Sequence, residues 1–192
     1  MGGGISVFDN ITKEDLIMAF FPCIEFCDAK TMIFRGVSIF QKNWSLEKIM
    51  QKNIEFAKTR EYFFETLLKM VAVVAHRGLC MIIENPWNDS QQTYLQNNFI
   101  KPTIIDMNRA RRGDYYVKPT AYWFIGCKNT TGYSYQPNPH PKIVYKQHGE
   151  KQVTGRCDEQ RSLISPDYAR NFICDFILGK EQEQFGKQLS LF

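Results

Sequence analysis

An unbroken apolar run, Leu16–Phe21, leads directly into Pro22 and Cys23. A run of this length, preceded by the charged residues 13–15, is typical of a strand that is covered on both faces, as in a parallel sheet. In open α/β sheets the ligands lie beyond the carboxyl ends of the strands. The sequence therefore places Cys23 where a nucleophile can act if its thiolate is stabilised. A cysteine in such a run is also often a small buried hydrophobe, and that interpretation stays open.

A second buried strand is predicted at Leu79–Ile83. Between the two strands, a helical pattern of apolar residues begins after Ser45, which can cap a helix, and stops at Gly78. Further strands are expected at residues 102–105 and 121–127, and a last helix at residues 165–179. This alternation predicts an α/β fold with a mostly parallel sheet and flanking helices. Residues 24–43 have no clean period and are predicted to form a long loop.

Glu84 ends the second strand as Cys23 ends the first. A carboxyl group that partial burial keeps protonated can act as an acid. A glutamate at this place can equally be a helix cap or a charge partner. Two such strand ends, separated by one helical crossover, favour a functional role for both residues.

The composition argues against a membrane protein and permits a nucleic-acid partner. No apolar run of the 192 residues approaches the roughly 18–20 that a membrane helix needs, and no signal peptide is evident. The formal net charge of +4 allows an acidic partner such as DNA without demanding one. Six cysteines without a Cys-x-x-Cys pair predict reduced thiols in a cytoplasmic protein. His140 and His148 have no further ligands at suitable spacing, so no metal site is expected.

Five short motifs resemble, in order, those of the DNA cytosine-5 methyltransferases, most closely the short phage-type members. They are the Pro-Cys strand Asp15–Cys23, Glu84-Asn85-Pro86, Arg109-Ala110-Arg111, the run Tyr115–Trp123 with its Lys-Pro-Thr, and Arg161–Arg170. Met107 stands where the family has a Gln before its Arg-x-Arg pair. The resemblance covers residues 9–178 and implies a Rossmann-like, S-adenosylmethionine-dependent methyltransferase fold that is truncated at its start.

The resemblance also implies roles for the matching residues. Cys23 is expected to attack C6 of cytosine, and Glu84 to protonate N3. Arg109 or Arg111 is expected to hold the base carbonyl or to favour the thiolate. The target base must leave the duplex, because C6 is out of reach within the stack. The loop at residues 24–43, which carries Lys30, Arg35 and Lys42, is expected to move over the DNA.

The segment that holds S-adenosylmethionine in this family is missing before Cys23. The family begins with a strand, a Phe-x-Gly-x-Gly turn and an acid for the ribose, and this chain has none of them there. By this resemblance, Asp9 corresponds to the acid that contacts the adenine of the cofactor. Pro22 corresponds to a residue that lines the same pocket. Either the chain is truncated, or another polypeptide supplies the N-terminal half in trans, or the protein no longer methylates. Glu25 would also disfavour a Cys23 thiolate unless its carboxylate points away.

One catalytic domain is expected at residues 1–179, with a short recognition-like insert at 128–160, followed by a flexible tail at 180–192. The tail ends in Gln188, Leu189, Ser190, Leu191 and Phe192. This pentapeptide matches the motif by which bacterial polymerases and repair proteins bind the sliding clamp. The clamp is therefore an expected partner beside DNA, and the alternative is that these side chains fold back onto their own domain.

Other interpretations stay open. Asn85-Pro86-Trp87 resembles the motif with which amino-methyltransferases grip an exocyclic amine and stack an aromatic ring on the base. The missing cofactor segment favours a non-catalytic DNA- or clamp-associated binding module derived from a methyltransferase. A basic and aromatic group is predicted to contact phosphates and bases, or else to form a solvated turn. Its members are Arg109, Arg111, Arg112, Tyr115 and Tyr116.

Overall fold

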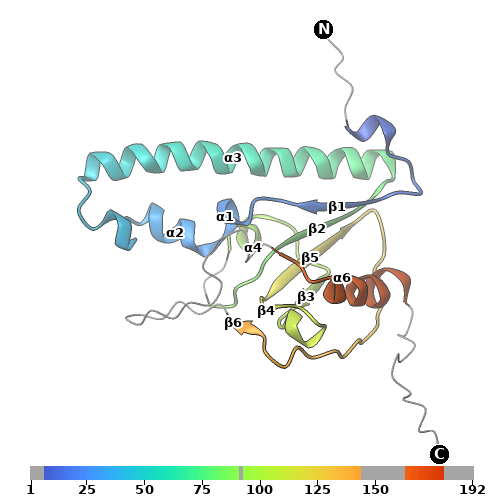
Figure 1. The fold of residues 1–192 in the computed structure, drawn as a ribbon. Coiled ribbons are helices and arrows are strands. Elements are labelled where there is room, and N and C mark those ends of the chain that lie inside the picture. The colour runs from blue at the N-terminus through green and yellow to red at the C-terminus, as the bar shows by residue number, and fades with distance from the viewer. Residues whose placement is uncertain (1–6, 91–92, 144–162, 180–192) are drawn as a thin grey trace, which may run out of the picture. The chain divides into compact units, whose positions relative to one another are not determined.

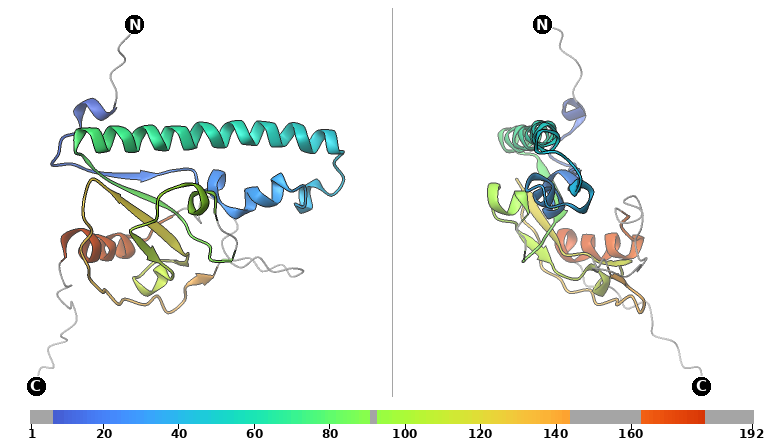
Figure 2. Two further views of the ribbon diagram at one scale, coloured as in Figure 1. Left: turned by 180° about the vertical axis from the view of Figure 1, so that it is seen from behind. Right: turned by 90° about the vertical axis from the view of Figure 1, so that its left-hand side faces the viewer.

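The computed structural model describes residues 7–90, 93–143 and 163–179. The chain divides into two compact units, Met1–Ile105 with Ala121–Lys128, and Asp106–Thr120 with Asn129–Phe192. Figure 1 shows the path of the chain, and Figure 2 shows the same elements from two further sides. The described residues form both helices and a four-stranded sheet, which confirms the predicted α/β fold class.

The first unit holds a four-stranded sheet with the order β1-β2-β5-β3. Its elements are η1 (Val7–Asn10), β1 (Leu16–Phe20), α1 (Cys23–Phe26), α2 (Asp28–Phe34), η2 (Ile39–Gln41), α3 (Leu46–Arg77), β2 (Cys80–Pro86), α4 (Tyr94–Asn98), β3 (Ile104–Asp106) and β5 (Thr120–Ile125).

Strands β1 and β2 are parallel and are joined by α3, which lies along β1 in both Figure 1 and Figure 2. The helix begins after Ser45, whose hydroxyl accepts a hydrogen bond from the Lys48 backbone nitrogen at 3.3 Å. It ends at Gly78, which has a φ of 62°. Both predicted ends of this helix are confirmed. Every residue of β2 from Met81 to Asn85 is buried, as expected for a parallel strand that is covered on both faces.

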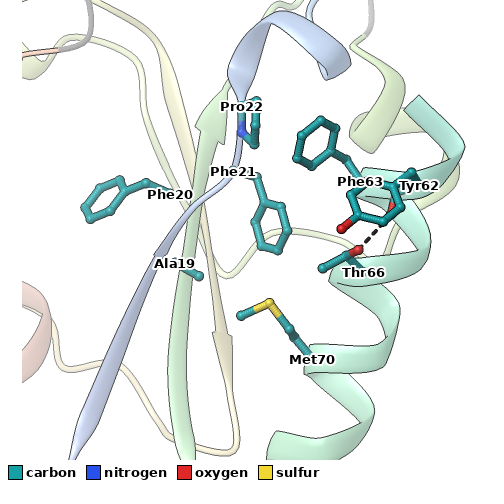
Figure 3. Close-up of a pocket in the computed structure, with 8 residues that line it drawn as sticks. All are labelled: Ala19, Phe20, Phe21, Pro22, Tyr62, Phe63, Thr66 and Met70. Atoms are coloured by element: carbon teal, nitrogen blue, oxygen red, sulfur yellow. Dashed lines mark hydrogen bonds between the residues drawn. The ribbon is translucent and has the colours of Figure 1, made fainter. Parts of the chain in front are cut away.

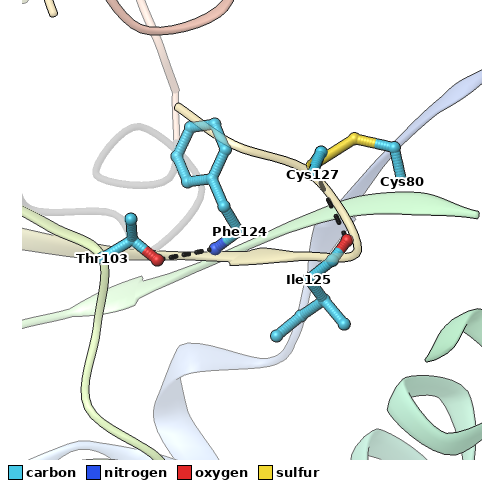
Figure 4. The surroundings of a disulfide bond; sticks show 5 residues. All are labelled: Cys80, Thr103, Phe124, Ile125 and Cys127. Carbon is cyan, nitrogen blue, oxygen red and sulfur yellow. Dashed lines mark hydrogen bonds between the residues drawn. A yellow bond between two sulfur atoms is a disulfide. The ribbon is translucent and has the colours of Figure 1, made fainter. Parts of the chain in front are cut away.

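Strand β5 runs antiparallel to β2, because the residues after β5 return to the residues before β2. A Cβ on Gly126 would lie 2.0 Å from the Leu79 carbonyl oxygen, so this close approach requires glycine. Cys127 forms a disulfide with Cys80 beside it (Figure 4). The sheet is therefore mixed, and the prediction that all the cysteines are reduced is wrong for this pair.

The prediction of a long loop at residues 24–43 is also wrong, because the segment is largely helical. It forms α1, α2 and η2. Lys30, which was expected on a loop facing DNA, is only 6% exposed and lies on α2. Its ammonium lies 3.9 Å from the centre of the Phe56 ring on α3, so its charge is not available to a phosphate.

The second unit is held together by two arginines, Arg109 and Arg112, and their carboxylate partners. Its elements are η3 (Arg109–Arg111), β4 (Tyr116–Val117), β6 (Lys142–Ile143), α6 (Pro166–Ile173) and a π-helical turn at Cys174–Leu178. The Ser165 hydroxyl caps α6 by accepting a hydrogen bond from the Tyr168 backbone nitrogen at 3.0 Å. This confirms the predicted start of the last helix.

No helix within the described ranges is long and apolar enough to cross a membrane. The tail at residues 180–192, with its pentapeptide, lies outside the described residues, as does most of the predicted insert at 128–160.

Candidate functional site

The carboxyl ends of β1 and β2 lie side by side in the first unit. Phe20, the last residue of β1, is in register with Glu84 of β2. Pro22, with its φ of −56°, precedes α1, and Cys23 is the first residue of that helix. Cys23 is half-buried. The structure thus brings together the two strand ends that the sequence singled out.

Two buried polar residues lie near the carboxyl end of β2, just before its last residue, Pro86. Glu84 is 6% exposed and Asn85 is fully buried. Neither side-chain polar atom of Asn85 has a hydrogen-bond partner among the residues that the structure describes. Leaving a buried polar group unsatisfied costs about 1–3 kcal/mol, so a buried water is the expected partner of this amide. Asn85 was predicted only as part of two motifs, although a polar residue that follows a buried apolar strand is a signal in itself.

The carboxylate of Glu25 is balanced by a neighbouring cation. Glu25 is 8% exposed, and its Oε1 lies 3.3 Å from the Lys30 ammonium. The predicted unfavourable effect of Glu25 on a thiolate at Cys23 is therefore offset by Lys30, whose charge is of opposite sign.

An apolar pocket of about 280 Å³ lies at the end of β1 against α3 (Figure 3). It is lined by Ala19, Phe20, Phe21, Pro22, Tyr62, Phe63, Thr66 and Met70. In Figure 3 the Phe21 ring points toward α3, whereas the Phe20 ring points to the other side of β1. The Thr66 hydroxyl donates a hydrogen bond to the Tyr62 carbonyl oxygen at 2.8 Å. The pocket therefore presents mainly apolar surface, and neither Cys23 nor Glu84 is among the residues that line it.

The structure does not bring Asp9 and Pro22 together. Pro22 lines the pocket beyond the carboxyl end of β1. Asp9 lies on η1, before the amino end of β1, and Arg77 at the end of α3 fixes this turn by donating to the carbonyl oxygens of Phe8 and Ile11. The two residues lie at opposite ends of one strand, so they do not line one pocket together.

The two arginines of the Arg-x-Arg motif, both in the second unit, have different environments. Arg109 is 1% exposed, pairs with Asp114 and lies 4.5 Å from the centre of the Tyr168 ring. Arg111 is exposed. Arg109 is therefore held by partners inside the second unit, and Arg111 is the more accessible of the two.

The basic and aromatic group that was predicted to contact nucleic acid is largely internal to the second unit. Arg112 pairs with Asp106 at 3.2 Å and with Asp175 at 3.0 Å. Tyr116 is 3% exposed, whereas Tyr115 is 43% exposed. Of the five members, Arg111 and Tyr115 remain accessible to a ligand.

The geometry at Asn85 also weighs against the amino-methyltransferase interpretation. That chemistry needs the amide to reach a substrate amine, and the Asn85 side chain is fully buried. The Trp87 indole N–H donates to the Asp89 carboxylate at 2.6 Å, so the ring is held by its own loop.

Within residues 7–90, 93–143 and 163–179, no cluster of three or more His, Cys, Asp or Glu side chains could hold a metal ion. No protein-family model matches the chain, and no curated protein or solved structure matches it either. The case for a function therefore rests on the residues of the site.

Proposed function

We propose that this chain is the cytosine-binding part of a DNA cytosine-5 methyltransferase, with Cys23 as the nucleophile and Glu84 as the acid. One observation carries the proposal. The parallel pairing of β1 with β2 sets the end of a Pro-Cys strand beside a buried glutamate. The five motifs in the order of the family support it, as does the partnered state of Glu25 next to the nucleophile.

The chemistry that these two side chains supply is an addition to the pyrimidine ring. The Cys23 thiolate forms a bond to C6, and the π electrons of C5–C6 move to C4–C5. The electron pair of C4–N3 moves to N3, which takes a proton from Glu84. The product is an enamine that is nucleophilic at C5, which cytosine itself is not.

The substrate is cytosine in DNA, flipped out of the duplex so that C6 becomes accessible. In the second unit, Arg111 and Tyr115 are exposed side chains of the types that contact phosphates and stack on bases. The formal net charge of +4 favours the approach to DNA. We also propose a cytoplasmic location because the proposed partner is DNA; the cysteines do not support this location, since Cys80 and Cys127 form a disulfide.

The strand order supports a missing first half of a Rossmann-like methyltransferase fold. A doubly wound nucleotide-binding sheet has the order 3-2-1-4-5-6. In this chain, β1, β2 and β3 would correspond to strands 4, 5 and 6 of that sheet. They follow one another in the same order, with the antiparallel β5 inserted between β2 and β3. The first three strands have no counterpart among the described residues. We therefore propose that S-adenosylmethionine is held mainly by a polypeptide outside this chain, with Pro22 at the edge of its pocket.

A duplex that carries 5-fluorocytosine tests the proposal, because fluorine at C5 blocks release of the enzyme after methyl transfer. The chain is mixed with S-adenosylmethionine and the recombinant N-terminal half of a phage-type cytosine-5 methyltransferase. We expect a covalent adduct that Cys23→Ser abolishes. Cys27→Ser, a change at a second half-buried cysteine four residues away, is the matched control and should retain the adduct. An adduct that survives Cys23→Ser refutes the assignment.

A non-catalytic DNA-associated module is the alternative, and the incomplete cofactor pocket favours it. That alternative predicts DNA binding without an adduct in any of these mixtures.

The sliding clamp is a further proposed partner, through Gln188-Leu189-Ser190-Leu191-Phe192. The match of the pentapeptide to the clamp-binding motif supports it. Docking would raise the local concentration of the site on newly replicated DNA.

A further inference from the structure

Strand β1 is an edge strand with one open face. In the order β1-β2-β5-β3 its one neighbouring strand within the described ranges is β2, so its outer edge presents backbone N–H and C=O groups for pairing. Leu16, Met18 and Phe20 alternate along it and are 39%, 37% and 56% exposed. Because alternate residues of a strand point to one face, the three side chains form a single exposed apolar face.

The opposite face of β1 is covered. Ile17 and Ala19 pack into the core of the first unit, and Figure 3 shows Phe21 turned toward α3. The neighbouring strand β2 is buried on both faces. Parallel strands are normally covered in this way. Among the residues that the structure describes, β1 therefore lacks two things that β2 has, which are a second pairing strand and a cover for its open face.

We propose that the outer edge and open face of β1 bind a βα unit of a polypeptide other than these 192 residues. Its strand pairs parallel to β1, and its helix covers Leu16, Met18 and Phe20. A βα unit supplies both missing parts at once, and β-strand addition to an exposed edge is a recurring mode of recognition. The identity of this partner, the half that carries the Gly-rich cofactor turn, rests on the proposed function.

A second copy of this chain fits the same edge less well. A two-fold axis through the sheet would pair the two edges antiparallel. The charged residues 13–15 of one copy would then lie against the apolar end of β1 in the other. Two paired strands of five residues each also cover less than the roughly 1,200–2,000 Å² that stable interfaces bury. A strand with a covering helix adds the apolar face to the contact.

The test mixes the full chain with the recombinant N-terminal half of a phage-type cytosine-5 methyltransferase that ends before its Pro-Cys strand. Calorimetry measures binding, and hydrogen exchange with mass spectrometry follows the amides of residues 16–20. We expect a complex in which these amides exchange more slowly, and about tenfold weaker binding after Phe20→Lys. Ile54→Lys on α3 is the matched control, because Ile54 is 57% exposed and Phe20 56%. It should bind as the parent chain does.

Three results would overturn the inference. In the first, the recombinant N-terminal half does not bind the chain. In the second, the amides of residues 16–20 are already protected in the chain alone. In the third, the chain forms a dimer that Phe20→Lys dissociates. The last result would make a second copy the occupant. Binding at β1 without any methylation refutes the proposed function and leaves the docking site standing. An adduct at Cys23 in a chain that does not bind the half refutes the docking site alone.

Discussion

Glu84 lies directly beside Phe20 across the parallel pair of β2 and β1. This register decides which side chains meet at the end of the sheet, since Cys23 follows Phe20 by three residues. A slip of one residue would turn every side chain of a strand to the other face and replace Glu84 by Ile83 or Asn85. The candidate site therefore depends on the pairing of the strands, and neither motif creates it alone.

Replacing Glu84 by glutamine should slow adduct formation with the 5-fluorocytosine duplex by roughly 10²–10⁴-fold, because the amide cannot deliver an acidic proton to N3. The measurement is the rate of covalent adduct formation for the parent chain and for Glu84→Gln. Asp89→Asn is the control, because this carboxylate lies five residues further along the chain and is exposed. A parent-like rate for Glu84→Gln would remove Glu84 from the mechanism.

The two arginines of the Arg-x-Arg motif should respond differently to substitution. Arg109→Leu leaves Asp114 charged and buried, and should lower the free energy of unfolding by about 3–5 kcal/mol. Arg111→Ala should change that free energy by about 0.5 kcal/mol or less, while weakening DNA binding. Urea unfolding followed by circular dichroism measures the first effect, and a filter-binding titration the second. Equal losses of stability would contradict the assigned roles.

The disulfide between Cys80 and Cys127 should stabilise the first unit. The two cysteines are 47 residues apart in sequence, and closing a loop of this size contributes about 2–4 kcal/mol. Cys127→Ser should therefore lower the free energy of unfolding by that amount under oxidising conditions. Reductant should lower the stability of the parent chain and leave that of the variant unchanged. A parent chain that does not respond to reductant speaks against the bond.

Removing residues 188–192 should abolish binding to a purified bacterial sliding clamp. Two leucines and a phenylalanine, each contributing about 1.5–3 kcal/mol when buried, allow binding in the micromolar range after the tail has been ordered. Calorimetry compares the full chain with a version that ends at Lys187. Equal affinity of the two would exclude the pentapeptide as the contact.

Local signals in the sequence were sufficient for the elements that frame the site. Ser45 and Gly78 mark the ends of α3 through backbone hydrogen bonding and a left-handed conformation, which depend only on neighbouring residues. The apolar runs that became β1 and β2 were equally local. Because α3 joins them, their parallel pairing followed from the connection.

Features that depend on distant residues were not predictable. Lys30 is buried by contact with Phe56, 26 positions further along the chain, and the short helices around it have no continuous apolar period. The disulfide needed the antiparallel insertion of β5 beside β2, which brings Cys127 back to Cys80.

The different roles of the two arginines in the Arg-x-Arg motif were likewise not predictable from the sequence. Arg109 and Arg111 look alike in sequence, and only the burial of Arg109 against Asp114 and Tyr168 separates their roles.

The central claim is that Cys23 adds to C6 of a flipped pyrimidine. The most direct measurement incubates the full chain with a pool of duplexes that carry 2-pyrimidinone, with randomised flanking sequence, with and without the N-terminal half. This base lacks the 4-amino group and is attacked at C6 more readily than cytosine, so no methyl donor is needed. Peptide mass spectrometry then locates the cross-link. The account predicts a cross-link on Cys23 that Cys27→Ser retains and Cys23→Ser removes. A cross-link on Cys27, or none in either mixture, would contradict it.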